Sequence, residues 1–135
     1  MRSLLFLSGL FTLAAQTVLV RQVLAGGGVN ELSLGILLGS WLFWIGVGSL
    51  VALHRPAAAP PRAARQALAA ALAYLPALCL QLGGAAWLRP LTGTAPGDPF
   101  SLLHLAPVLA GLTAPVSLVT GFLFVRACAG LGGGR

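Results

Sequence analysis

Few side chains in this sequence can carry chemistry. Its 135 residues include two acids, Glu31 and Asp98, two histidines and two cysteines. Acid–base and nucleophilic catalysis both need several such groups around one substrate. The sequence contains no serine–histidine–acid set, no glycine-rich phosphate loop and no paired carboxylates. We therefore expect a protein that is not an enzyme and that has no cofactor of its own.

The histidines and cysteines also argue against a haem or a metal. His54 follows the second apolar segment of the chain and His104 precedes the fourth, so the two are expected at opposite ends of a bundle. Two histidines at different depths cannot ligate one haem. Cys79 and Cys128 lie far apart, without the spacing of a zinc site, and are interpreted as small hydrophobic residues.

One small set of polar residues remains as a candidate pair or pocket: Gln16, Arg21, Asn30 and Glu31. Arg21 ends the first apolar run, where it can extend to the lipid headgroups or pair with Glu31 across a glycine-rich turn. Asn30 and Glu31 open the second apolar segment. They can serve as a helix cap and a dipole partner, with a ligand or proton role for Glu31 as the alternative.

The composition places these residues in a membrane. Hydrophobic residues make up 58% of the chain and charged residues 7%, whereas about 25% is usual in soluble domains. About 20 apolar residues cross the hydrocarbon core of a bilayer as a helix. We predict one all-α membrane domain over residues 1–135, a polytopic bundle of about four helices near residues 4–24, 32–53, 66–88 and 106–125.

The connecting segments complete this prediction. Residues 54–65 are expected to form a cytoplasmic loop, and residues 100–105 a short stretch at the outer interface. Pro107 and Pro115 are expected to kink the fourth helix. The N-terminus resembles a secretory signal peptide, but Leu13 fits poorly three residues before the cleavage site. We therefore predict a retained first helix.

The arginines predict the orientation of the bundle. Six of the eight fall on one side of the predicted helices, including three in the second loop. Cytoplasmic loops carry the excess of basic residues, which predicts that both termini face the cytoplasm of a bacterial inner membrane. The arginines form no continuous basic surface, so no nucleic-acid partner is expected.

The second apolar segment carries a stripe of small residues. We assign helix packing to Gly35, Gly39, Gly46, Gly48 and Ser49. Small residues allow helix backbones to approach closely in lipid. The expected partners are the bilayer and either other membrane subunits or a second copy of the chain.

The first half of the chain also resembles a known family. Residues 16–22, 30–35, 41–42 and 46–49 together resemble the N-terminal membrane region of bacterial spermidine-synthase-like integral membrane proteins. That family usually adds a soluble aminopropyltransferase-like domain, which this sequence lacks. The resemblance therefore implies no active-site residue here, only the polar set Gln16, Arg21, Asn30 and Glu31.

Three functions are consistent with these features. The first is a non-catalytic membrane subunit that packs against and anchors the proteins of a complex, for example a respiratory or electron-transfer complex. The second is a half-transporter that acts as an oligomer. The third is the membrane component of a split spermidine-synthase-like protein.

Overall fold

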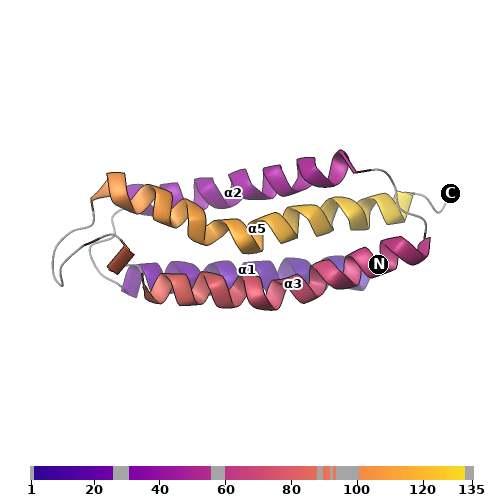
Figure 1. Ribbon diagram of the computed structural model, residues 1–135, viewed down its shortest axis with the longest axis horizontal. Helices are drawn as coiled ribbons and strands as arrows, with labels where there is room; N and C mark the ends of the chain where they lie inside the picture. The colour runs from indigo at the N-terminus through magenta and orange to yellow at the C-terminus, as the bar shows by residue number, and fades with distance from the viewer. Residues whose placement is uncertain are drawn as a thin grey trace.

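The computed structural model contains four helices and no strand within residues 2–25, 31–55, 60–87, 90–91, 93 and 101–132, which are the residues it describes. The helices are α1 (Arg2–Ala25), α2 (Glu31–Leu53), α3 (Pro60–Ala86) and α5 (Leu102–Gly132). Consecutive helices run antiparallel, so the start of α1 and the end of α5 lie at one end of the bundle (Figure 1). We call this the terminal end and the opposite end the His104 end. The all-helical prediction is confirmed.

Two helices differ in extent from the predicted ranges, because α3 starts before residue 66 and α5 extends past both ends of 106–125. α3 begins at Pro60, inside the segment expected as the loop 54–65. Proline is well tolerated in the first turn of a helix, where its missing N–H would have no helical partner. α5 begins at Leu102 and runs to Gly132, so residues 102–105 are helical and continuous with the rest of α5. Their place at the outer interface stays a prediction. Pro107 and Pro115 both lie inside α5.

Three of the helices are long and apolar enough to cross a membrane. The spans are Phe6–Ala25, Glu31–Leu53 and Leu102–Ala129. α3 falls short because its apolar part covers only Ala71–Ala86. At about 1.5 Å per residue this part rises about 24 Å, less than the roughly 30 Å of a hydrocarbon core. Large apolar side chains are exposed on all four helices, as expected of a surface that faces lipid.

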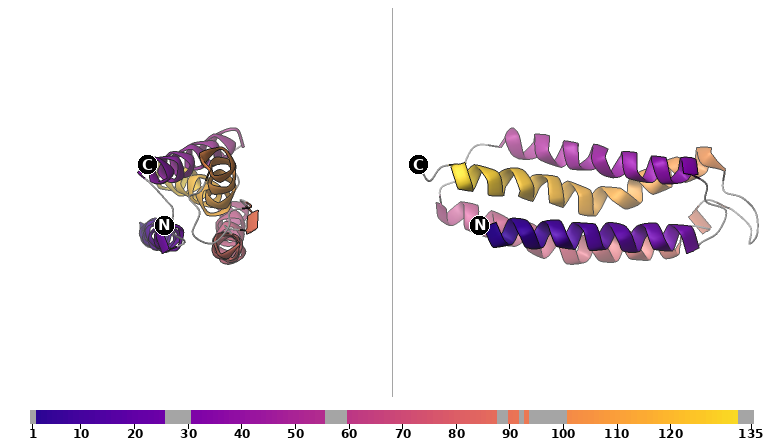
Figure 2. Two further views of the ribbon diagram at one scale, coloured as in Figure 1. Left: turned by 90° about the vertical axis from the view of Figure 1, so that its left-hand side faces the viewer. Right: turned by 180° about the vertical axis from the view of Figure 1, so that it is seen from behind.

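α5 is the central helix of the bundle. It packs most extensively against α2 and also contacts α3 and α1, while α1 and α3 contact each other. Viewed along the bundle, α2 and the α1–α3 pair lie on different sides of α5 (Figure 2). α2 is therefore a peripheral helix with a large outer face.

Glycines bring α2 and α5 into close contact. A Cβ atom on Gly48 would clash with the backbone of Leu118, and one on Gly121 would clash with the backbone of Ile45. Ser49 Oγ donates a hydrogen bond to the carbonyl oxygen of Gly121 over 3.3 Å. Small residues on both helices thus allow backbone contact without a hydrophobic driving force from water.

Two apolar clusters form the core. The leucine cluster, towards the His104 end, contains Leu19, Val23, Leu37, Leu105, Leu109 and Leu112. The tyrosine cluster, towards the terminal end, contains Ala15, Tyr74, Ala77, Val116 and Leu123. Buried polar residues lie in and between these clusters, and they form the candidate site.

Candidate functional site

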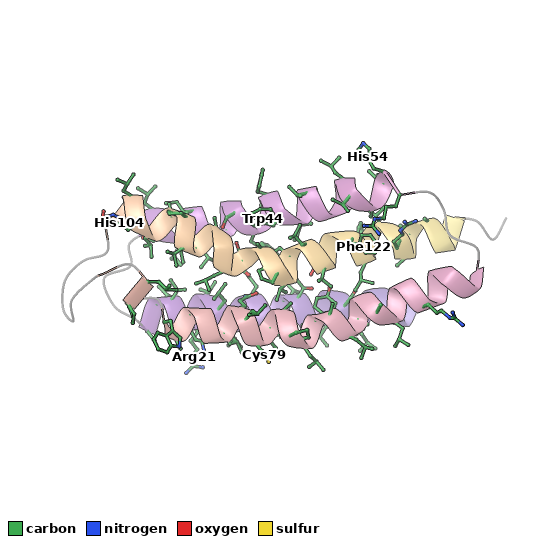
Figure 3. The ribbon with its side chains drawn as sticks, in the orientation of Figure 1. Arg21, Trp44, His54, Cys79, His104 and Phe122 are labelled. Atoms are coloured by element: carbon green, nitrogen blue, oxygen red, sulfur yellow. The ribbon has the colours of Figure 1, made fainter. Side chains whose placement is uncertain are left out.

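The structure separates the polar residues that the sequence suggested as a pair. Arg21 and Glu31 are both exposed, and within the described parts of the chain no ion pair or hydrogen bond joins them. Arg21 points away from the bundle (Figure 3). The two residues belong to α1 and α2, which are not among the closely packed helix pairs. Asn30 lies outside the described residues.

Gln16 has a different environment from Arg21 and Glu31. Its side chain is only 8% exposed and faces the interior of the bundle. Of the candidate polar set, Gln16 is thus the one described residue that the fold buries.

The residues assigned to helix packing also fall into two groups. Gly48 and Ser49 contact α5. Gly35, Gly39 and Gly46 are exposed, and a Cβ atom on any of them would meet nothing within 4 Å. These three glycines have no role in packing among the described residues, so a contact with another molecule stays a prediction for them.

A cluster of three hydroxyl groups connects α1, α3 and α5. Tyr74 Oη donates a hydrogen bond to Thr120 Oγ1 over 3.0 Å, and Thr12 Oγ1 lies 3.0 Å from Thr120 Oγ1 and 3.5 Å from Tyr74 Oη. Thr12 and Thr120 also donate to backbone carbonyls of their own helices, those of Ser8 and Val116. We call Thr12, Tyr74 and Thr120 the hydroxyl triad.

A second polar group lies beyond the triad, towards the His104 end. Its buried members are Gln16 on α1, Gln81 on α3, and Thr113 and Ser117 on α5. Measured along each helix from the triad, Ser117 lies about 4.5 Å away and Gln16 about 6 Å, while Gln81 and Thr113 each lie about 10 Å away. All four displacements point the same way, because α5 is antiparallel to α1 and α3. We call these four residues the mid-bundle layer.

The mid-bundle layer divides the core. Gln16 lies between Ala15 of the tyrosine cluster and Leu19 of the leucine cluster, and Gln81 lies between Ala77 and Ala85. Gln16, Thr113 and Ser117 lie in the central parts of the spans Phe6–Ala25 and Leu102–Ala129. Gln81 lies within the shorter apolar part of α3, Ala71–Ala86. Polar groups at this depth have no bulk water to bind, so each depends on a partner inside the protein.

Hydroxyl groups of the layer satisfy part of this need. Ser117 donates to the carbonyl of Thr113 over 2.6 Å, and Thr113 donates to the carbonyls of Leu109 and Ala110. Ser40 Oγ lies 3.1 Å from Thr113 Oγ1 and so connects α2, the helix that contributes no member, to the layer.

Trp44 adds a second connection between α2 and α5. Its indole Nε1 donates to the carbonyl of Ala110 over 2.8 Å. Pro115 has no N–H to donate to the carbonyl of Gly111, the residue next to Ala110, so the contact lies beside a missing backbone hydrogen bond of α5. The contact joins the middle of α2, where Trp44 lies (Figure 3), to the first third of α5.

Two amide atoms of the layer are left without partners. Gln16 Nε2 and Gln81 Oε1 are buried and make no hydrogen bond within the described residues. An unsatisfied buried polar group costs about 1–3 kcal/mol. One atom is a donor and the other an acceptor, so the two are chemically complementary.

Sequence reasoning identifies Gln16 but misses the other members of the layer and the triad. A usable signal is present in their spacing. Thr12 and Gln16 are four residues apart, Tyr74 and Gln81 are seven apart, and Thr113, Ser117 and Thr120 follow at four and three. These intervals place polar residues on one face of an otherwise apolar helix.

The histidines lie at opposite ends of the bundle, as expected from the sequence (Figure 3). Where the structure describes side chains, no group of three histidine, cysteine, aspartate or glutamate residues is placed to hold a metal ion. Cys79 and Cys128 are both exposed and unpaired.

No protein-family model, curated protein or solved structure matches this chain. The resemblance to the membrane region of spermidine-synthase-like proteins therefore stays a prediction.

Proposed function

We propose that this protein is a non-catalytic integral membrane subunit, and that the outer face of α2 packs against a transmembrane helix of a partner protein. The observation that carries this proposal is the exposure of Gly35, Gly39 and Gly46. At about 100° per residue, Gly39 and Gly46 lie within roughly 40° of Gly35 around the helix. We call this stripe the glycine face.

The packing inside the chain supports this use of the glycine face. On the inner side of α2, Gly48 allows contact with the backbone of α5. Glycine in the interior of a helix is unfavourable by about 1 kcal/mol relative to alanine. Three glycines on an outer stripe carry this cost without any contact within the described residues, and a close helix–helix approach would offset it.

The residues beside the glycine face fit the same role. Leu38, Leu42 and Leu50 are exposed on or next to the stripe. In membrane interfaces, flat glycine surfaces flanked by larger apolar side chains allow close van der Waals contact. Glu31, one turn before Gly35, is a charged residue at the start of this face, but from Gly35 to Leu50 the face carries no charge. An uncharged surface over this length favours a transmembrane helix as the partner over a soluble protein.

The proposed setting is a bacterial inner membrane, with both termini in the cytoplasm. Arg55, just after α2, and Arg65, in the first turns of α3, are exposed. The end of α2 and the start of α3 lie at the terminal end of the bundle (Figure 1). Arg126 lies on α5 near the same end, with its guanidinium 5.6 Å from the ring centre of Phe122. Basic residues concentrate on the cytoplasmic side of such proteins.

Purification from native membranes in mild detergent tests this proposal. The experiment compares the tagged wild-type protein with Gly39→Leu and with the matched control Gly83→Leu. Gly83 is an exposed glycine on α3 that also has nothing within 4 Å of an added Cβ. We expect a stoichiometric partner to co-purify with wild type and Gly83→Leu but to be depleted at least tenfold with Gly39→Leu. Equal recovery with all three proteins would contradict a docking role for α2.

A half-transporter that acts as an oligomer is the second candidate. The mid-bundle layer favours it, because transporters place polar binding residues near the middle of the membrane. Cysteine labelling distinguishes the two functions. Ser117→Cys is introduced into a chain whose two native cysteines are replaced by alanine, and its reaction with a membrane-impermeant maleimide is measured. Labelling from the aqueous phase would support a transport pathway, whereas protection supports a packed subunit.

A further inference from the structure

The mid-bundle layer contains a donor and an acceptor that lack partners within the described residues. Gln16 Nε2 on α1 and Gln81 Oε1 on α3 are both buried, with side chains 8% and 1% exposed. α1 and α3 contact each other, and both contact α5. Counted along each helix from the triad, the backbone positions of the two glutamines differ in depth by about 4.5 Å.

We propose that a water molecule is bound inside the bundle between these two side chains. It accepts a hydrogen bond from Gln16 Nε2 and donates one to Gln81 Oε1. The inference concerns the interior of the chain, so it is independent of the partner proposed for α2.

The chemistry of the layer selects water over other occupants. The ligand must accept from one amide and donate to the other, which neither a lipid chain nor a simple ion can do. The layer has no charged side chain among its members, so an ion would lie there without a counter-charge. The members of the two apolar clusters that flank the layer offer no polar group to the two amides, so a small neutral molecule that both donates and accepts hydrogen bonds fits their chemistry.

α5 supplies a third partner for the water. Ser117 donates its hydroxyl hydrogen to the carbonyl of Thr113 over 2.6 Å, which leaves the lone pairs of its oxygen as acceptors. The second hydrogen of the water can be donated to this oxygen. Buried waters typically make about three hydrogen bonds, and Gln16, Gln81 and Ser117 supply that number from three helices.

Nuclear magnetic resonance of the protein in lipid nanodiscs tests the proposal. The chain has four glutamines, so selective ¹⁵N labelling of their side-chain amides gives a simple spectrum. Gln16→Met identifies the Gln16 signal. We expect the Gln16 amide to show a nuclear Overhauser cross peak to water in the wild-type protein, and we expect Gln81→Met to remove it. The exposed side chain of Gln22 serves as the control and should keep its cross peak to water in both proteins.

Two results would overturn the proposal. One is a Gln16 amide without a water cross peak in the wild-type protein while Gln22 shows one. The other is a Gln16 cross peak that persists unchanged in Gln81→Met, because the water would then not be shared between the two amides. The wild-type measurement stands alone if Gln81→Met does not fold.

Discussion

At the scale of single residues, the glycines on α2 and α5 differ sharply in their surroundings. Gly48 and Gly121 are buried where the backbones of α2 and α5 meet, and neither has room for a Cβ atom. Gly111 on α5 is exposed, and a Cβ there would meet nothing within 4 Å. The same substitution should therefore have opposite consequences at Gly121 and Gly111.

Gly121→Ala should destabilise the bundle. The new methyl group would meet the backbone of Ile45, which cannot move aside as a flexible side chain can. Forcing extra atoms into a packed core typically costs about 1–3 kcal/mol. Thermal unfolding in detergent should show a lower midpoint for Gly121→Ala than for wild type. Gly111→Ala is the control and should be neutral or slightly stabilising, and equal midpoints for the two variants would contradict the close contact between Gly121 and Ile45.

Tyr74→Phe tests the hydroxyl triad. The substitution keeps the ring that packs against Phe11 at 4.8 Å but removes the hydrogen bond to Thr120. We expect a loss of about 1 kcal/mol in unfolding free energy, because Thr120 keeps its bond to the carbonyl of Val116. Denaturation in mixed micelles measures this loss of unfolding free energy. The loss should disappear when the background already carries Thr120→Val, and an undiminished loss there would show that the two hydroxyls do not interact.

The site can be predicted only in part from single residues. The sequence singles out Gln16 as a polar residue in an apolar helix, and it is buried in the mid-bundle layer. Arg21 and Glu31 are close in the sequence, yet their helices pack against α5 rather than closely against each other. Sequence separation does not show which helix lies between two others, because that depends on side-chain packing along their whole length.

At the scale of elements, α3 differs most from a simple membrane span. Its first turns carry Arg62 and Arg65, and only Ala71–Ala86 is strongly apolar. We expect the arginine-bearing part to extend out of the hydrocarbon on the cytoplasmic side. The sequence places the start of this helix too late, because two adjacent prolines resemble a helix breaker, although proline is tolerated in the first turn where they lie.

Reporter fusions test the orientation of the elements. A green fluorescent protein fused after α5 should fluoresce, and an alkaline phosphatase fused there should be inactive, because the basic terminal end faces the cytoplasm. A phosphatase fused in the segment between α1 and α2 should be active. An active phosphatase at the C-terminus would reverse the proposed topology.

At the scale of the whole molecule, α5 contacts all three other helices, whereas α2 packs closely only against α5. The number and type of elements follow from apolar length alone, which is why the all-helical bundle can be predicted. The arrangement of the helices cannot be predicted from the sequence, because the spanning part of α2 is apolar on all sides and does not indicate which side faces α5. Gly48 and Gly39 look alike in the sequence, but one faces α5 and the other faces outward.

The most direct test of the proposed subunit role is site-specific photocrosslinking in native membranes. A photoreactive amino acid at Leu42, on the glycine face, is compared with the same group at Leu13 on α1 and Leu75 on α3, which are similarly exposed. We predict a discrete protein adduct at Leu42 and only lipid adducts at the other two positions. Lipid adducts alone at Leu42 would contradict the claim that α2 docks a partner helix.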